Sequence, residues 1–180
     1  FALRRSLHRS PPDDLIDDMY VSFSVLCDGY RIIRAPDILA HEESATVAHD
    51  EFRRKVRIAC QAFNVHRALW PRLRQLDALN LTKYIIHKFL RWFTIYWLVL
   101  AVVFFEVGMI SVGYLFYGLL LLCGGVMGMM MGVRRNISPV PQLWDMVIAF
   151  TGTGLGIIRS LQGQRFQTWT PAASVREAKS

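Results

Sequence analysis

Two adjacent carboxylates, Asp17 and Asp18, stand at the head of a segment whose pattern predicts a short helix over residues 19–28. Carboxylates at this position accept hydrogen bonds from the free amide groups of the first helical turn, so capping alone would explain them. A carboxylate that faces a substrate can instead remove a proton from it. Gly29 follows the helix, at a place where a left-handed residue ends many helices.

The second group of chemical interest is the basic run Arg-Arg-Lys-Val-Arg at residues 53–57. It lies in a segment, residues 47–69, whose apolar residues recur at helical spacing before Trp70 and Pro71 interrupt the pattern. We expect Arg53 and Lys55 to lie on a solvent- or lipid-facing side of this helix. The five histidines and three cysteines have no spacing typical of metal ligands, and the cysteines predict no disulfide framework.

The charge of the chain is unevenly distributed. The 180 residues are 53% hydrophobic with a formal net charge of +7, yet Glu106 is the only charged residue between positions 92 and 133. Basic residues flank this apolar region on both sides, namely Lys83, Lys88, Arg91, Arg134 and Arg135. Because the flanks of membrane spans collect Lys and Arg, this pattern favours contact with anionic lipid over binding of nucleic acid.

The apolar region predicts an α-helical membrane segment. Residues 80–91 have the pattern of an amphipathic helix at a bilayer surface. Residues 92–107 and 109–133 are expected to form a transmembrane hairpin, since a span needs about 20 apolar residues, with Glu106 in its turn. A further apolar stretch, residues 143–158, is a third span, a re-entrant piece or an interfacial helix, and the basic tail argues against a full span. Its glycine-rich sequence, residues 152–157, is better explained by helix packing than by nucleotide binding.

Strands are expected in the polar part of the chain. The opening residues 1–5 are compatible with a strand, and the run Tyr-Arg-Ile-Ile-Arg-Ala at residues 30–35 predicts a buried or half-buried one that ends before Pro36.

Three stretches carry a resemblance to a known family: "IDDMYVSFSVLCDGYRIIRAPDILAHEE", "EFRRKVRIACQ" and the opening "FALRRS". In this order they resemble the C-terminal half of the catalytic domain of family 2 glycosyltransferases, the group that includes cellulose, chitin and hyaluronan synthases. The later "HKFLRW" and "GQRFQTWTPAASVR" resemble the helix that leads into the membrane and the closing tail of these enzymes. The resemblance implies a fragment of an α/β domain of GT-A type followed by transmembrane helices.

The resemblance also implies roles for individual residues. Asp18 corresponds to the family's general base, which removes the proton of the acceptor hydroxyl as it attacks the anomeric carbon, and Asp17 corresponds to its partner carboxylate. Arg57 corresponds to the arginine that binds the diphosphate of the donor. Arg54 takes the place of a glutamine that binds the acceptor in processive members, which favours the addition of single sugars. Glu42 corresponds to the glutamate after the strand.

The family's donor-binding half and its metal site would lie upstream of residue 1. No cofactor is therefore expected in this fragment, whereas the full-length enzyme would use a divalent metal, Mg or Mn, and the fragment alone would be inactive. The implied partners are a nucleotide-sugar donor, a glycan or lipid-linked acceptor, and membrane lipid.

These expectations combine into one hypothesis and one alternative. The hypothesis is a membrane-bound, inverting glycosyltransferase of polysaccharide biosynthesis, with residues 1–79 in the cytoplasm, an interfacial helix over 80–91, two spans over 92–133, and a short apolar helix with a basic tail over 134–180. The alternative is a non-catalytic membrane-anchored module that binds anionic lipid or a protein partner.

Overall fold

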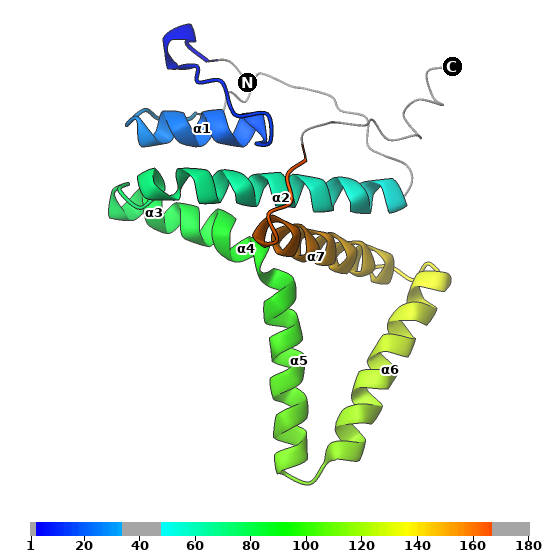
Figure 1. The fold of residues 1–180 in the computed structure, drawn as a ribbon. Coiled ribbons are helices and arrows are strands. Elements are labelled where there is room, and N and C mark those ends of the chain that lie inside the picture. Colours follow the sequence, from blue (N-terminus) through cyan, green and yellow to red (C-terminus); the bar gives the residue numbers. More distant parts are fainter. Residues whose placement is uncertain (1–2, 34–47, 167–180) are drawn as a thin grey trace, which may run out of the picture.

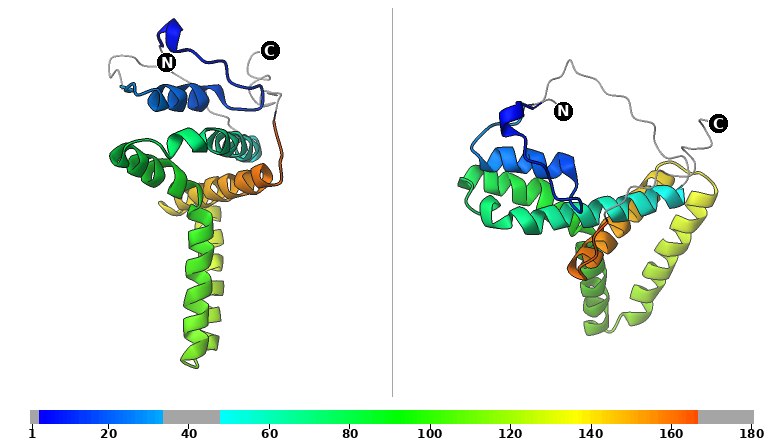
Figure 2. Two further views of the ribbon diagram at one scale, coloured as in Figure 1. Left: turned by 60° about the vertical axis from the view of Figure 1, so that its left-hand side comes forward. Right: turned by 45° about the horizontal axis from the view of Figure 1, so that its top comes forward.

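The protein is arranged as tiers of helices above a helical hairpin (Figure 1). The structure is a computed structural model, and it describes residues 3–33 and 48–166. In chain order the elements are η1 (Arg5–Leu7), α1 (Asp17–Cys27), α2 (Ala48–Leu73), α3 (Ala78–Tyr84), η2 (Ile85–Phe89), α4 (Leu90–Trp92), α5 (Thr94–Ser111), α6 (Leu115–Arg134) and α7 (Val140–Leu161). Helix α1 lies on one side of α2, α7 lies on the other, and α5 and α6 project away from both (Figures 1 and 2).

The predicted α/β fold is wrong: the described residues form helices and contain no strand. Arg5–Leu7 is a turn of 3-10 helix, and residues 30–33 have no regular structure. Ile33 is 85% exposed, although its β-branched side chain favours strands. A strand needs a neighbour that accepts and donates its backbone hydrogen bonds, and no other described segment offers one. Residues 1–2 and 34–35, the rest of the two predicted strands, lie outside the described residues.

The short helix α1 forms largely as the sequence predicts. It begins at Asp17, two residues earlier than expected, and its first turn carries both aspartates. Gly29 follows it with φ of 85°, which confirms the predicted left-handed end. Val21, Ser24 and Val25 are its buried residues.

Helix α2 is longer than predicted because Pro71 does not end it. Proline removes one backbone donor and disturbs the preceding turn, but at this position only the last turn of the helix follows. The helix therefore continues to Leu73, which is fully buried together with Val65. Each such side chain stabilises the fold by about 1.5–3 kcal/mol relative to an exposed position.

The predicted helix over residues 80–91 is present as a continuous helical stretch from Ala78 to Trp92, in which the π-helical turn η2 separates α3 from α4. The division accompanies an aromatic cluster that joins these pieces to α2, formed by Phe63, His66, Phe89, Trp92 and Phe93. The rings of His66 and Phe89 lie 4.9 Å apart between centroids. A π-helical turn shifts the following side chains around the axis, which lets Phe89 and Trp92 both reach α2.

His66 is the buried polar centre of the aromatic cluster. Its Nδ1 lies 2.6 Å from Oη of Tyr84. Burial lowers the pKa of His66 from 6.5 to about 4, so between these pH values the unfolded chain binds a proton that the folded chain does not. The neutral, buried His66 therefore contributes its full share to the free energy of unfolding above pH 6.5. This share declines as the pH falls toward 4.

We therefore expect acidification from neutral pH to about pH 5 to lower the free energy of unfolding by about 2 kcal/mol through His66 alone. The measurement is the midpoint of thermal unfolding in detergent at the two pH values. His66→Gln should show a smaller difference between the two pH values than the wild type, whereas His87→Gln, at an exposed position, should leave it unchanged. An equal difference in wild type and His66→Gln would contradict the assignment.

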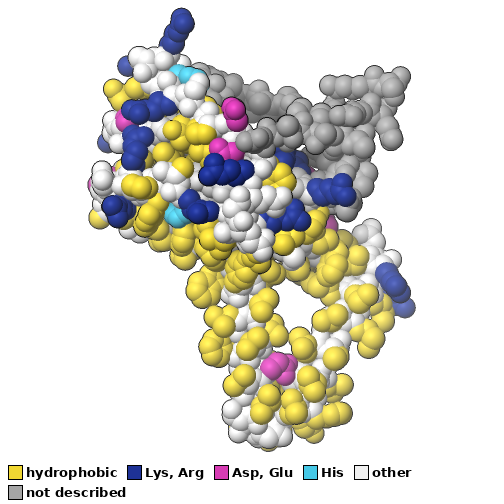
Figure 3. All heavy atoms as spheres, viewed as in Figure 1, with side chains coloured by type: hydrophobic (Ala, Val, Ile, Leu, Met, Phe, Trp, Pro, Cys, Tyr) yellow, Lys and Arg dark blue, Asp and Glu magenta, His cyan; other side chains and the backbone are white. Residues whose placement is uncertain are grey.

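Helices α5 and α6 are long and apolar enough to cross a membrane. Their side chains are almost entirely exposed and form the apolar surface of the lower part of the molecule (Figure 3). The prediction that Glu106 lies in the turn of this hairpin is wrong: α5 continues to Ser111, and Gly113, with φ of 79°, makes the turn. A helix that ended at residue 107 would be only about 21 Å long, whereas the 18 residues of α5 extend about 27 Å.

Helix α7 packs along α2 rather than beside α5 and α6 as a third member of a bundle (Figure 1). Gly152 and Gly156 face α2, while Gly154 faces α5 and accepts a 2.8 Å hydrogen bond from Oη of Tyr96. The prediction that these glycines serve helix packing is confirmed. Arg67 on α2 also donates a hydrogen bond to the carbonyl of Ser160.

Candidate functional site

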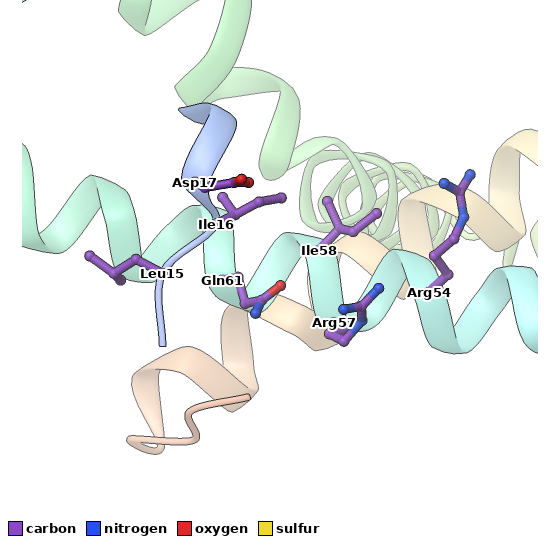
Figure 4. A pocket seen from close by; sticks show the side chains of 7 residues that line it. All are labelled: Leu15, Ile16, Asp17, Arg54, Arg57, Ile58 and Gln61. Atoms are coloured by element: carbon purple, nitrogen blue, oxygen red, sulfur yellow. The ribbon is translucent and has the colours of Figure 1, made fainter. Parts of the chain in front are cut away.

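The start of α1 lies against one face of α2 and forms a pocket there (Figure 4). Leu15, the buried residue two positions before α1, fixes the start of this helix. It packs in a core cluster with Val65, Leu69, Leu73 and Tyr84. The preceding Asp14 forms an ion pair of 3.1 Å with Arg165, which follows α7. The first turn of α1 is thus held at a fixed place over the middle of α2.

The pocket has a volume of about 360 Å³. It contains three of the five site residues that the sequence analysis proposed: Asp17 from α1, and Arg54 and Arg57 from α2. The remaining lining residues are Leu15, Ile16, Ile58 and Gln61. The wall from the start of α1 therefore combines two apolar side chains with one carboxylate, and the wall from α2 carries both guanidinium groups (Figure 4).

The two arginines differ in their surroundings. Nε of Arg54 donates to Glu51 at 2.8 Å, and this hydrogen bond is the main cause that lowers the pKa of Glu51. Arg57 forms no hydrogen bond or ion pair with any described residue. Partial burial, and then the positive charge of Arg54, lower the pKa of Arg57, although a guanidinium remains charged at neutral pH. An anion in the pocket would relieve the repulsion between the two cations.

The two aspartates also differ. Oδ1 of Asp17 accepts a hydrogen bond from the amide of Asp18, and Oδ1 of Asp18 accepts one from the amide of Met19. Ile16, rather than either aspartate, occupies the N-cap position. Asp17 lines the pocket, whereas Asp18, the residue to which the resemblance assigns the general base, does not. Both side chains are exposed, so each keeps an oxygen available to a substrate.

The segment that follows α7 lies against α2 beside the pocket. Gln61 donates a 3.0 Å hydrogen bond to the carbonyl of Phe166, and Asn64 donates one of 3.2 Å to the carbonyl of Gln164. Gln61 lines the pocket but was not predicted as a site residue. Its position four residues after Arg57 places it on the same helical face, which was the available signal.

The other predicted site features have different outcomes. Glu42 lies outside the described residues. Arg53 is exposed, as expected. Lys55 is only half-exposed, because its Cβ lies against Gly152 of α7 while its ammonium group pairs with Glu51 at 3.4 Å, so the expectation of a solvent- or lipid-facing position is wrong for this residue. No group of three His, Cys, Asp or Glu side chains that could hold a metal ion occurs in the parts of the chain that the structure describes. The pocket offers one carboxylate beside two cations, which does not fit a divalent metal, so the steps proposed below use protein side chains alone.

The arrangement can bind an anionic group between α1 and α2 and present a carboxylate to a neutral group beside it. Comparisons with models of protein families, with curated proteins and with solved structures found no match.

Proposed function

We propose that the chain is the membrane-anchored part of a glycosyltransferase that transfers a sugar from a nucleotide donor to a glycan or lipid-linked acceptor. The observation that carries the proposal is the meeting of Asp17, Arg54 and Arg57 in one pocket. These residues belong to two motifs that are about 40 positions apart in the sequence and that the resemblance independently assigns to one active site.

The proposed reaction proceeds in one displacement. The acceptor hydroxyl attacks the anomeric carbon, the bond from that carbon to the diphosphate oxygen breaks, and the hydroxyl proton passes to the carboxylate of Asp18, which inverts the anomeric centre. Asp17 orients the acceptor from the wall of the pocket. The guanidinium group of Arg57 stabilises the negative charge that develops on the diphosphate.

The proposal places α5 and α6 across the membrane and the helical tiers in the cytoplasm. It is supported by the position of Lys83, Lys88 and Arg91 before α5 and of Arg134 and Arg135 at the other end of the hairpin. Since both ends of a hairpin lie on the same side, all five residues would face the cytoplasm.

Arg57→Gln is expected to weaken the binding of inorganic pyrophosphate by about 10-fold or more, because a charge-assisted hydrogen bond contributes about 1.5–3 kcal/mol. Isothermal titration of the purified protein in detergent measures the change. Pyrophosphate serves as the probe because it is the charged part shared by nucleotide-diphosphate sugars.

The matched control is Arg53→Gln, which removes the same charge from an exposed position on the same helix. It should change pyrophosphate affinity by less than about 3-fold, as expected for a screened surface charge. Equal weakening by the two substitutions would mean that pyrophosphate responds only to the general positive charge of α2, and the assignment of the pocket would be wrong.

A non-catalytic module is the second candidate, because a pocket with two arginines also fits the phosphate of an anionic lipid. Vesicles of phosphatidylcholine with and without phosphatidylglycerol distinguish the two. The module predicts that Arg57→Gln reduces binding to the anionic vesicles and that no nucleotide sugar is consumed by the full protein, whereas the enzyme predicts consumption of the sugar.

A further inference from the structure

The contact between α5 and α6 contains a carboxyl group that the proposed reaction does not use. The two helices diverge from the turn at Gly113 toward α7, so their close contact is confined to the end near the turn (Figure 1). Glu106 lies in this contact, opposite Gly118. A Cβ added at Gly118 would lie 2.5 Å from Oε2 of Glu106, which shows how closely the carboxyl group approaches α6.

Both carboxyl oxygens of Glu106 are buried, and neither has a hydrogen-bond partner among the described residues. The neighbouring side chain on α5 is that of Met109, which is apolar. An ionised carboxylate without a partner is costly in hydrocarbon, by about 3 kcal/mol or more at the middle of a span. A protonated carboxyl group avoids most of this cost because it carries no charge.

No cation of the hairpin can neutralise Glu106. Apart from Arg134, the titratable groups of the facing helix and its turn are Tyr114, Tyr117 and Cys123, which are not cationic and are all exposed. Arg134, the first basic residue of α6, lies 16 positions beyond Gly118, or about 24 Å along the helix. On α5 itself there is no basic residue.

We propose that Glu106 is a proton-binding site within the hairpin, protonated while α5 and α6 are in contact, and that loss of this proton separates the two helices. The proton would leave toward the turn, since Ser111 at the end of α5 is only five residues, about 8 Å, away. The charge that remains draws water into the contact. The inference rests on the membrane hairpin of the proposed function, and it is independent of sugar transfer.

The first test is labelling of the protein in phosphatidylcholine vesicles with dicyclohexylcarbodiimide, an apolar reagent. A protonated carboxyl group adds across one carbon–nitrogen double bond of the reagent, so the labelled peptide gains the mass of the whole molecule. At neutral pH we expect Glu106 to be labelled by this reagent and not by a water-soluble carbodiimide, with labelling reduced at alkaline pH. The exposed Asp145 of α7 should react with the water-soluble reagent and serves as the internal control.

The second test measures helix separation through Met109→Cys and a membrane-permeant maleimide that requires water for its reaction. Raising the pH should increase labelling of this cysteine at least about 5-fold more in the Glu106 protein than in a Glu106→Gln background, since a neutral amide cannot ionise. The ratio between the two backgrounds removes the intrinsic pH dependence of the thiol.

Two results would overturn the inference. One is modification of Glu106 by the water-soluble reagent or by neither reagent, and the other is equal pH dependence of Met109→Cys labelling in the two backgrounds. Alkaline carbonate extraction tests separately whether the hairpin anchors the protein in the membrane. A protein that stays in the membrane but fails the labelling tests overturns the inference alone, whereas a protein that is extracted overturns the membrane hairpin and the inference together.

Discussion

Replacement of Asp18 by Asn is expected to reduce sugar transfer by the full protein about 100- to 10,000-fold, the range typical of the loss of a general base. The amide has nearly the same shape as the carboxylate but cannot take the proton of the acceptor hydroxyl. The hydrogen bond from the amide of Met19 can be retained by the side-chain oxygen of Asn, so α1 should form normally. Transfer is measured in membranes with a panel of radiolabelled UDP- and GDP-sugars.

Asp17→Asn is the matched variant, because the two residues share the first turn of α1 and are both exposed. If Asp17 only orients the acceptor, its replacement should raise KM and leave kcat within about 10-fold of the wild type. A larger loss of kcat in Asp17→Asn than in Asp18→Asn would transfer the role of base to Asp17, the residue that lines the pocket. Unchanged transfer in both variants, with protein inserted in the membrane, would contradict the proposed function.

Replacement of Gly156 by Val is expected to destabilise the packing of α7 on α2 by about 2–3 kcal/mol, the upper part of the usual range for overpacking. A Cβ at this position would lie 2.5 Å from the carbonyl oxygen of Val56 and 2.6 Å from Cβ of Ala59. The first of these is a backbone atom of α2, which cannot turn away as a flexible side chain does, so the two helices must move apart. Thermal unfolding in detergent measures the loss.

Gly128→Ala is the control for this prediction. Gly128 lies inside α6, and a Cβ there meets no atom within 4 Å. Since alanine favours a helix over glycine by about 1 kcal/mol, this substitution should leave stability unchanged or raise it slightly. If Gly156→Val unfolds at the temperature of the wild type, the close contact between α2 and α7 is not a determinant of stability.

Local sequence signals predicted the individual helices well. The helix after the two aspartates and its end at Gly29 depend on interactions within a few residues, which is why the chain alone revealed them. Because only local signals were used, the hairpin turn was predicted at the wrong glycine. Gly108 and Gly113 are equivalent as local turn signals, and only the length of helix needed to cross a membrane favours the second.

The wrong predictions concern features that depend on residues far apart in the sequence. The run at residues 30–35 has the composition of a strand, but a strand exists only when another segment completes its hydrogen bonds. The resemblance strengthened that expectation, because it implied a sheet. The contact of Glu106 could not be predicted from local sequence either. Its neighbour, Gly118, belongs to a different helix, so no spacing within α5 could identify the contact.

The candidate site was predicted in part. Spacing along α2 places Arg54, Arg57 and Gln61 on one face of a helix, and this could be read from the sequence. The position of Asp17 above that face required the core around Leu15, which brings together residues about 50 positions apart. No local pattern predicts such packing.

The order of the tiers has a consequence for the length of an acceptor. Gly156 of α7 contacts α2 at Val56 and Ala59, whereas the pocket is formed by other residues of α2 that face α1, so the pocket opens on the side away from α7. Two helical layers, each about 10 Å thick, therefore separate the pocket from the apolar hairpin. In the proposed reaction, a single sugar attached to a lipid head group would be too short to bridge this gap, whereas a chain of several sugars could extend across it. The stacking of α2 on α7 would thus favour long acceptors over short ones. It would also keep the phosphate of a membrane lipid away from the pocket, which argues against the lipid-binding module.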